Sequence, residues 1–375
     1  MTKSRYIMIG GFLGAGKTTA INAFARFLDE RSLKVGLITN DQGSGLVDSA
    51  LGRRSGRFPV EEIAGGCFCC RFNSLTEAAS RLTEATAPDV FLAEPVGSCT
   101  DLVATVSLPL KKIYGESYAV APLSVVVDPI RALRVLGFDP DGRRFSENVL
   151  YIYGKQLEEA EIIVINKIDL VSDEQRQTLR TALAATYPDA RLVEVSAREG
   201  TGLAAWFETA LAEEIDVPRF LEIDYARYGQ GEALLGWLNT TVAIGDPDEE
   251  YDGNALLRSL AAALRTSLDA SGLEVAHLKM TLAPTGAPME LAAINLVRTD
   301  AQPELSHTLV DPLDSPAELL LNIRAEADPG SLQDAVTRAL DEILSTSHGL
   351  AFTIPHSEHF RPGQPTPTHR LTTAT

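Results

Sequence analysis

The stretch Tyr6-Ile7-Met8-Ile9-Gly10-Gly11-Phe12-Leu13-Gly14-Ala15-Gly16-Lys17-Thr18-Thr19 decides the fold of this 375-residue chain. Four apolar residues lead into a glycine-rich loop, and the helical pattern of residues 18–28 follows. Glycines let backbone N–H groups converge on phosphate oxygens, and the N-terminus of the following helix adds its positive dipole end. A strand, a glycine-rich loop and a helix in this order therefore predict a phosphate-binding loop.

The loop residues are predicted to share the binding of a nucleotide. Lys17 pairs with the β- and γ-phosphates, and the Thr18 hydroxyl ligates Mg²⁺. The predicted nucleotide-binding positions of this stretch are Gly11, Gly14, Ala15, Gly16, Lys17, Thr18 and Thr19. The alternative, a glycine-rich turn without a ligand, is disfavoured by the flanking strand and helix.

Residues 1–217 show apolar runs that alternate with helical stretches, which predicts an α/β domain. The runs are Tyr6–Ile9, Val35–Thr39, Val90–Ala93, Leu123–Val127, Ile162–Ile165 and Leu192–Val195. This alternation favours a mostly parallel, doubly wound sheet with helices on both faces, as in P-loop NTPases. Ligands in such folds bind at the carboxyl ends of the strands.

A smaller α+β domain is predicted over residues 233–354, after a linker at residues 218–232. Alternating apolar residues at Leu319, Leu321 and Ile323 are typical of a sheet with one solvated face. Residues 355–375 contain prolines and histidines without hydrophobic periodicity, so we predict a flexible tail there. His356 and His359 are spaced to share a metal ion, although a polar tail also acquires histidines without a role.

The run Asn166-Lys167-Ile168-Asp169 follows a predicted strand and indicates the base that is bound. A carboxylate at Asp169 can accept two hydrogen bonds from guanine, whereas adenine offers no such pair of donors. Ser196 and Ala197 end the next strand, where a backbone N–H can meet guanine O6. The motif alone could be a charged turn, but both elements together predict GTP rather than ATP.

Two acidic residues at strand ends are candidates for the chemistry of hydrolysis. Lys17, Asp41 and Glu94 are the predicted catalytic residues, and the two acids are predicted to hold Mg²⁺ or its waters and to position the attacking water. Gly97 leaves room for a backbone N–H near the γ-phosphate. The alternative for both acids is a solvated loop position. Asp128 is interpreted as a helix cap before a proline.

Three of the four cysteines, Cys67, Cys69 and Cys70, follow two glycines. Thiolates at this spacing can turn toward one centre, and three sulfur ligands suit Zn²⁺ or another thiophilic ion while leaving one position open. A redox-reactive thiol cluster and a set of buried small hydrophobes are the alternatives. Cys99 stands alone and is interpreted as a core residue.

The composition excludes several classes of partner. A net charge of −18 argues against binding to nucleic-acid phosphates. No apolar run reaches membrane-spanning length, and the N-terminal residues show no signal-peptide pattern. Few and clustered cysteines fit a reducing compartment. We expect a cytoplasmic protein without nucleic-acid or membrane partners.

These motifs together resemble the CobW-type P-loop GTPases, metallochaperone-like relatives of the proteins that mature urease and hydrogenase. The resemblance covers residues 6 to about 217 and rests on the glycine-rich loop, on Glu94-Pro95-Val96-Gly97, on Asn166–Asp169 and above all on Gly66-Cys67-Phe68-Cys69-Cys70. It implies Mg²⁺-dependent GTP hydrolysis, Zn²⁺ or Co²⁺ on the three cysteines, and a C-terminal domain that meets a client metalloprotein. A homodimer is also among the expected assemblies. The family usually has Asn-Glu-Phe-Gly where this chain has Asn40-Asp41-Gln42-Gly43.

The resulting hypothesis is a GTP-hydrolysing metallochaperone that delivers zinc or cobalt to a client. Two other readings use part of the same motifs. A P-loop small-molecule kinase shares Lys17 and Thr18 without needing the guanine or cysteine motifs. A metal-storage or sensor protein needs the cysteines but no hydrolysis.

Overall fold

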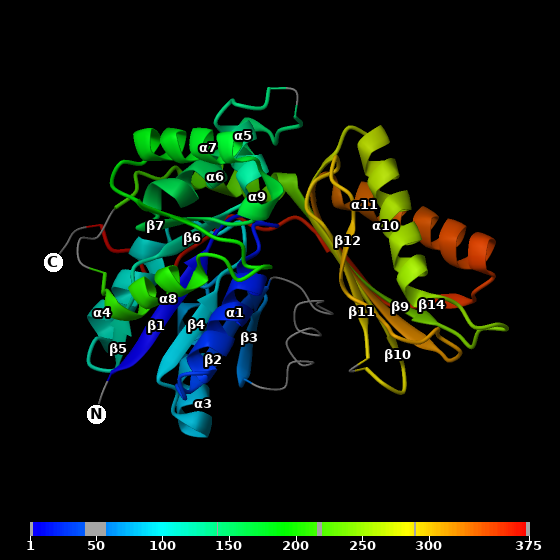
Figure 1. The fold of residues 1–375 in the computed structure, drawn as a ribbon, viewed down its shortest axis with the longest axis horizontal. Helices are drawn as coiled ribbons and strands as arrows, with labels where there is room; N and C mark the ends of the chain where they lie inside the picture. Colours follow the sequence, from blue (N-terminus) through cyan, green and yellow to red (C-terminus); the bar gives the residue numbers. More distant parts are fainter. Residues whose placement is uncertain (1–2, 42–57, 141, 216–219, 289, 373–375) are drawn as a thin grey trace. The chain divides into compact units, whose positions relative to one another are not determined.

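The computed structural model describes residues 3–41, 58–140, 142–215, 220–288 and 290–372. These residues form two compact units (Figure 1). The first unit holds the described residues up to 231 and also residues 364–372. The second unit holds residues 232–363. The end of the chain is therefore part of the unit that carries the phosphate-binding loop.

The first unit is built on a parallel sheet in which β1 is central. Within the described residues the strand order is β3-β2-β4-β1-β6-β7-β8, and β5 pairs with β1. The strands are β1 Ser4–Gly10, β2 Val35–Asp41, β3 Val60–Ala64, β4 Val90–Glu94, β5 Tyr118–Val120, β6 Ser124–Val127, β7 Ile162–Ile165 and β8 Arg191–Glu194. Because β1 lies between β4 and β6, the loop that follows β1 opens at the middle of the carboxyl edge.

Helices cover both faces of this sheet. They are α1 Lys17–Asp29, α3 Phe72–Thr86, α4 Leu108–Tyr114, α5 Pro129–Val135, α6 Glu147–Glu159, α7 Asp173–Thr186, α8 Leu203–Ala212 and α9 Tyr225–Leu234. Helix α1 buries Phe24 and Leu28 on the stripe that its 3.6-residue period creates. The Phe24 ring stacks on Phe207 of α8, with ring centroids 4.0 Å apart. Strand residues of alternate parity, such as Ile7 and Tyr6, are buried on opposite faces.

The second unit is a six-stranded antiparallel sheet within the described residues, in the order β12-β11-β10-β13-β9-β14. Its strands are β9 Leu235–Ile244, β10 Glu274–Pro284, β11 Ala292–Leu296, β12 Glu304–His307, β13 Ala317–Glu326 and β14 Phe352–Phe360. Helices α10 Gly253–Ala270 and α11 Pro329–Leu340 pack on it through one apolar core. Helix α11 continues into a π-helical turn at Asp341–Ser347.

The predicted fold class is confirmed: a doubly wound parallel sheet is followed by a smaller α+β unit. Strand β3 was missed because its sequence, Val-Glu-Glu-Ile-Ala, carries two acids and lies at the sheet edge. Residues 225–232, expected in a linker, belong to α9. That helix begins where the Asp224 carboxylate accepts hydrogen bonds from the backbone N–H groups of Ala226 and Arg227.

The structure also differs from the expected flexible tail at residues 355–375. Residues 355–360 belong to β14, whose backbone pairs with β9. His356 lies opposite Thr241 and His359 opposite Leu238, so the two rings leave opposite faces of the strand. The two histidines are therefore not arranged to share an ion. Among the described residues, no helix is both long and apolar enough to cross a membrane.

Candidate nucleotide and metal site

The phosphate-binding loop joins β1 to α1 in a conformation that only glycine adopts readily. Gly16, which precedes α1, has φ +96°. A Cβ atom there would lie 2.5 Å from the Asn166 amide nitrogen. Gly11 has φ +127°, and a Cβ atom would collide with the carbonyl oxygen of Val126. The glycines therefore let the loop pack directly against the neighbouring strand ends.

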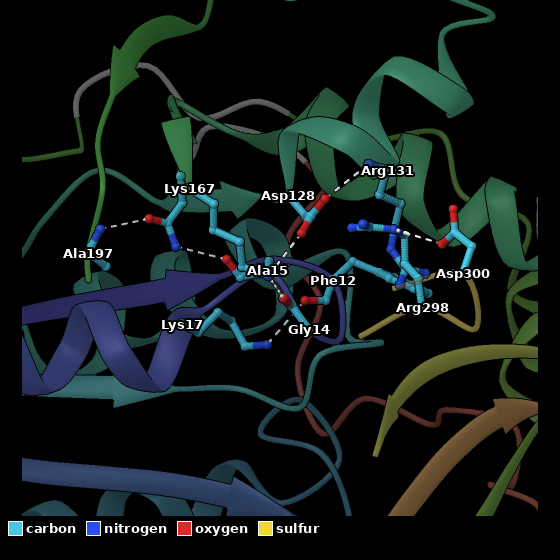
Figure 2. A network of polar contacts seen from close by, with 11 residues as sticks. Phe12, Gly14, Ala15, Lys17, Asp128, Arg131, Lys167, Ala197, Arg298 and Asp300 are labelled. Carbon is cyan, nitrogen blue, oxygen red and sulfur yellow. Dashed lines mark hydrogen bonds and ion pairs between the residues drawn. The ribbon is translucent and has the colours of Figure 1, made fainter. Parts of the chain in front are cut away.

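The predicted base-recognition residues are tied to this loop (Figure 2). The buried Asn166 amide donates to the Ala15 carbonyl at 2.9 Å, and its oxygen accepts the Ala197 backbone N–H at 2.9 Å. Lys167 Nζ donates to the Gly14 carbonyl at 2.7 Å. One amide side chain with both a donor and an acceptor thus joins three segments that are distant in sequence.

Three further residues complete the edge where the base is predicted to bind. Asp169 is exposed on a short 3₁₀ helix, Ile168–Leu170, which leaves its carboxylate accessible to a base. Ser196 is fully buried and accepts a hydrogen bond from the Glu199 backbone N–H. Asp128 caps α5 as expected, and its carboxylate also forms an ion pair with Lys167 at 2.9 Å. The ion pair was missed because it joins the ends of two neighbouring strands, β6 and β7, that are distant in sequence.

Lys17, Thr18 and Glu94 lie together at the start of α1 and the end of β4. Thr18 Oγ1 donates to Glu94 Oε1 at 2.9 Å. The Lys17 side chain is nearly buried, with its Nζ 3.5 Å from the Phe12 carbonyl oxygen. A hydroxyl beside a carboxylate is a set of hard oxygen ligands, which fits Mg²⁺.

Two other predicted residues of the hydrolytic site lie at neighbouring strand ends. Gly97 packs against the phosphate-binding loop, since a Cβ atom there would lie 2.9 Å from the Leu13 backbone nitrogen. Asp41 ends β2, and Thr39 of the same strand lies in register with Glu94. The Asp41 side chain and residues 42–43 lie outside the described part of the chain, so the role of Asp41 stays a prediction.

The three clustered cysteines converge on one point in the turn between β3 and α3. The Cys67 carbonyl accepts the backbone N–H groups of Cys70 and Arg71, which closes the turn. The sulfur of Cys67 lies 2.9 Å from that of Cys69 and 3.0 Å from that of Cys70, and the last two are 3.7 Å apart. Asn40, next to the end of β2, anchors the turn by donating to the Gly66 carbonyl at 2.6 Å.

Hydrogen bonds among the cysteines shift their pKa values in opposite directions. Hydrogen bonds with Cys69, Cys70 and Cys99 hold the pKa of Cys67 well below its ordinary value. The same hydrogen bonds, with burial and the Cys67 charge, raise the pKa of Cys69 and Cys70. The lowered pKa of Cys67 favours the thiolate, which is the form that binds metal.

The end of the chain lies along this turn as an extended segment that sequence reasoning did not anticipate. The Thr366 N–H donates to Cys70 Sγ at 3.3 Å, and the Thr368 N–H donates to the Cys69 carbonyl at 2.9 Å. Arg370 then forms an ion pair with the buried Asp101 at 2.7 Å. Prolines at 365 and 367 keep the backbone extended and lack N–H groups, so the threonines between and after them supply the donors.

The comparisons with known proteins place this site in a family. The model of the CobW/HypB/UreG nucleotide-binding domain matches residues 5–194. The chain belongs to this family of P-loop proteins. The match spans the phosphate-binding loop, the cysteine turn and the Asn166–Asp169 motif, and it ends before Ser196 and the whole second unit.

Several relatives carry names that refer to zinc. "Zinc chaperone YeiR" of Escherichia coli is 30% identical over 181 residues, which cover 47% of this chain and 50% of that protein. "Zinc chaperone CobW" of Sinorhizobium sp is 26% identical over 231 residues, covering 55% and 64%. This chain therefore spans about half to two thirds of the length of these relatives. A solved structure of Zn(II)-bound YjiA GTPase from E. coli is 16% identical, with a TM-score of 0.36 over 90% of this chain and 99% of that one.

Proposed function

We propose that this protein is a Mg²⁺-dependent GTPase that takes up Zn²⁺ or Co²⁺ on Cys67, Cys69 and Cys70 and delivers it to a client metalloprotein. The observation that carries the proposal is the convergence of these thiol groups within 4.8 Å, in the same unit as the phosphate-binding loop. Family membership supports the part of the proposal that concerns nucleotide binding and hydrolysis. The zinc chaperones among the relatives support the part of the proposal that concerns metal uptake and delivery.

The nucleotide chemistry follows from the residues that line the loop. Backbone N–H groups of the loop and Lys17 bind the β- and γ-phosphates, while Asn166 and Ala197 hold the edge where Asp169 selects guanine. Mg²⁺ at Thr18 and Glu94 supplies charge neutralisation of the phosphates. Glu94, held by the Thr18 hydroxyl, orients the attacking water, and Asp41 shares that role.

Coupling between the two sites requires that metal affinity differs between nucleotide states. The cysteine turn follows β3, which pairs with β2, and β2 pairs in turn with β4, which ends at Glu94. GTP orders the loops at Asp41 and Glu94 and thereby keeps the cysteine turn in its metal-binding shape. Hydrolysis releases these loops and lets the metal pass to the client.

The remaining parts of the proposal concern partners and location. The second unit binds the client, and two copies of the chain form a homodimer. Free thiols require a reducing compartment, so the protein acts in the cytoplasm. Size-exclusion chromatography with light scattering tests the dimer. Pull-down of the GTP-locked protein, followed by metal analysis of what co-purifies, identifies the client and its metal.

The decisive experiment measures zinc affinity with a non-hydrolysable GTP analogue and with GDP. We expect tighter binding with the analogue, and equal affinities would refute the coupling. Lys17→Ala should abolish GTP hydrolysis and metal delivery, whereas the exposed Lys34→Ala is a matched control that should leave both intact. Phosphate transfer only in the presence of an acceptor alcohol would favour a kinase. Metal handling unaffected by Lys17→Ala would favour storage or sensing.

A further inference from the structure

Cys99, which the sequence suggested was an ordinary core residue, is hydrogen-bonded to Cys67 of the three clustered cysteines. It lies in the segment after β4 and is 1% exposed. Its thiol is hydrogen-bonded to the sulfur of Cys67. Cys99 is not one of the thiols that lie within 4.8 Å of one another among the described residues, so it borders the group. Cys99 therefore adjoins the three-cysteine group through Cys67.

The backbone around Cys99 is held so that its thiol faces the cluster. Gln156 of α6 donates to the carbonyl of Gly97 at 2.9 Å and to the carbonyl of Cys99 at 2.8 Å. The hydroxyl of the next residue, Thr100, donates to the buried Glu159 of α6 at 3.0 Å. A cysteine that only fills space needs no polar partner. Here the fixed backbone directs the sulfur to another sulfur.

The size of the cluster leaves room for a fourth ligand. A tetrahedral zinc site with Zn–S bonds of about 2.3 Å has sulfur–sulfur edges of about 3.8 Å. The Cys69–Cys70 separation of 3.7 Å already matches that edge. The separations of 2.9 and 3.0 Å from Cys67 are shorter, so a bound ion must move Cys67 outward. Cys99, which is hydrogen-bonded to Cys67, is the remaining cysteine that can supply a fourth sulfur.

Cys99 also belongs to the segment that begins at the predicted Mg²⁺ site. That segment begins at Glu94, which accepts the hydrogen bond of Thr18, the predicted Mg²⁺ ligand. Four residues separate Glu94 from Cys99, and Gly97 among them packs on the phosphate-binding loop. A shift of Glu94 therefore reaches Cys99 through a short and buried stretch of chain.

We propose that Cys99 is the fourth thiolate ligand of the metal held by Cys67, Cys69 and Cys70, and that its engagement follows the position of Glu94. The inference deepens the proposed function and rests on it. With Cys99 bound, the ion has four sulfur ligands and is closed to solvent. When the Glu94 segment moves, Cys99 withdraws and leaves a three-sulfur site with one open position, from which a client ligand can take the metal.

X-ray absorption spectroscopy of the zinc-loaded full-length protein tests this by counting sulfur neighbours. We expect four sulfurs in the wild type with a GTP analogue, and three sulfurs plus one lighter atom in Cys99→Ser and Cys99→Ala. Zinc affinity should fall on the order of 10- to 100-fold or more in both variants, as it does when residues supporting a metal site are removed. GDP binding and thermal unfolding show that the variants are folded. With GDP, the wild type should show three sulfurs.

Different results would contradict the assignment of Cys99, its link to Glu94 and the proposed function. Three sulfurs in the wild type with the GTP analogue, or an unchanged sulfur count in both variants, would overturn the assignment of Cys99 and leave the chaperone proposal standing. Four sulfurs in both nucleotide states would overturn the link to Glu94. A wild-type protein that retains no zinc would overturn the proposed function together with this inference.

Discussion

Replacing Arg370 with alanine is expected to release the C-terminal segment from the cysteine turn. The Arg370 guanidinium pairs with the Asp101 carboxylate at 2.7 Å and donates to the Leu221 carbonyl at 2.9 Å. Asp101 is 1% exposed and also accepts a hydrogen bond from the Tyr225 hydroxyl. Removal of Arg370 leaves this buried carboxylate with one fewer donor, which is costly.

The size of the effect follows from the exposure of the pair. A hydrogen bond to a charged group contributes about 1.5–3 kcal/mol. Because the Arg370 side chain is 29% exposed, solvent screens part of the interaction, and we expect a loss of about 2 kcal/mol. Every 1.4 kcal/mol corresponds to about a factor of ten, so the undocked population of residues 366–371 should rise about 30-fold.

Hydrogen exchange measures this population directly. The amide N–H of Thr368 is bonded to the Cys69 carbonyl, and that of Leu371 to the Ala104 carbonyl, both at 2.9 Å. These amides exchange only when the segment detaches, so their exchange rates should rise about 30-fold together. Alkylation of Cys70, whose sulfur loses the Thr366 donor, should accelerate in the same variant.

Arg361→Ala is the matched control. Arg361 also forms an ion pair, with Asp328 at 3.0 Å, but both partners are well exposed, so solvent screens the pair and its contribution is small. Its loss should leave exchange at Thr368 and Leu371 nearly unchanged. Wild-type exchange rates at these amides in Arg370→Ala would show that Arg370 does not hold the segment. An equal acceleration in both variants would show that charge, not the buried pair, governs docking.

Two further predictions concern the nucleotide loop and the core of the first unit. Gly97→Ala should weaken GDP binding at least about tenfold in calorimetry, because its Cβ atom would press on Leu13 of the loop. The control Gly154→Ala, whose Cβ atom would meet nothing within 4 Å, should keep the affinity for GDP and raise the free energy of unfolding by about 1 kcal/mol. Full affinity in Gly97→Ala would contradict the close packing. Burial raises the pKa of Glu159 from 4.5 to about 8, so the folded chain keeps a proton that the unfolded chain releases. The free energy of unfolding should therefore fall as pH rises from about 4.5 to 8, as measured by denaturant titrations at several pH values. The decrease of this free energy with pH should be shallower in Glu159→Gln but unchanged in the exposed control Glu158→Gln.

The fold of the first unit was predictable because its signals are local. A buried parallel strand appears as an apolar run, and the glycine-rich loop and Asn166–Asp169 each specify their conformation within a few residues. Strand β3 was not predictable, since its two glutamates break the apolar pattern and only pairing with β2 makes it a strand. The strand at residues 355–360, within the predicted flexible tail, was not predictable for a similar reason, because β14 is defined by its partner β9.

Sequence alone predicts the phosphate-binding loop, the Asn166–Asp169 motif and three cysteines able to converge, since each needs only neighbours along the chain. Only the folded structure joins them. It brought Cys99 to Cys67, Thr18 to Glu94 and Arg370 to Asp101. These contacts link residues as many as 269 positions apart, and no local pattern encodes them. The Thr18–Glu94 contact depends on the order of the parallel strands, which brings the ends of β1 and β4 together at one edge of the sheet. The Arg370–Asp101 pair depends on how the C-terminal segment lies on the first unit.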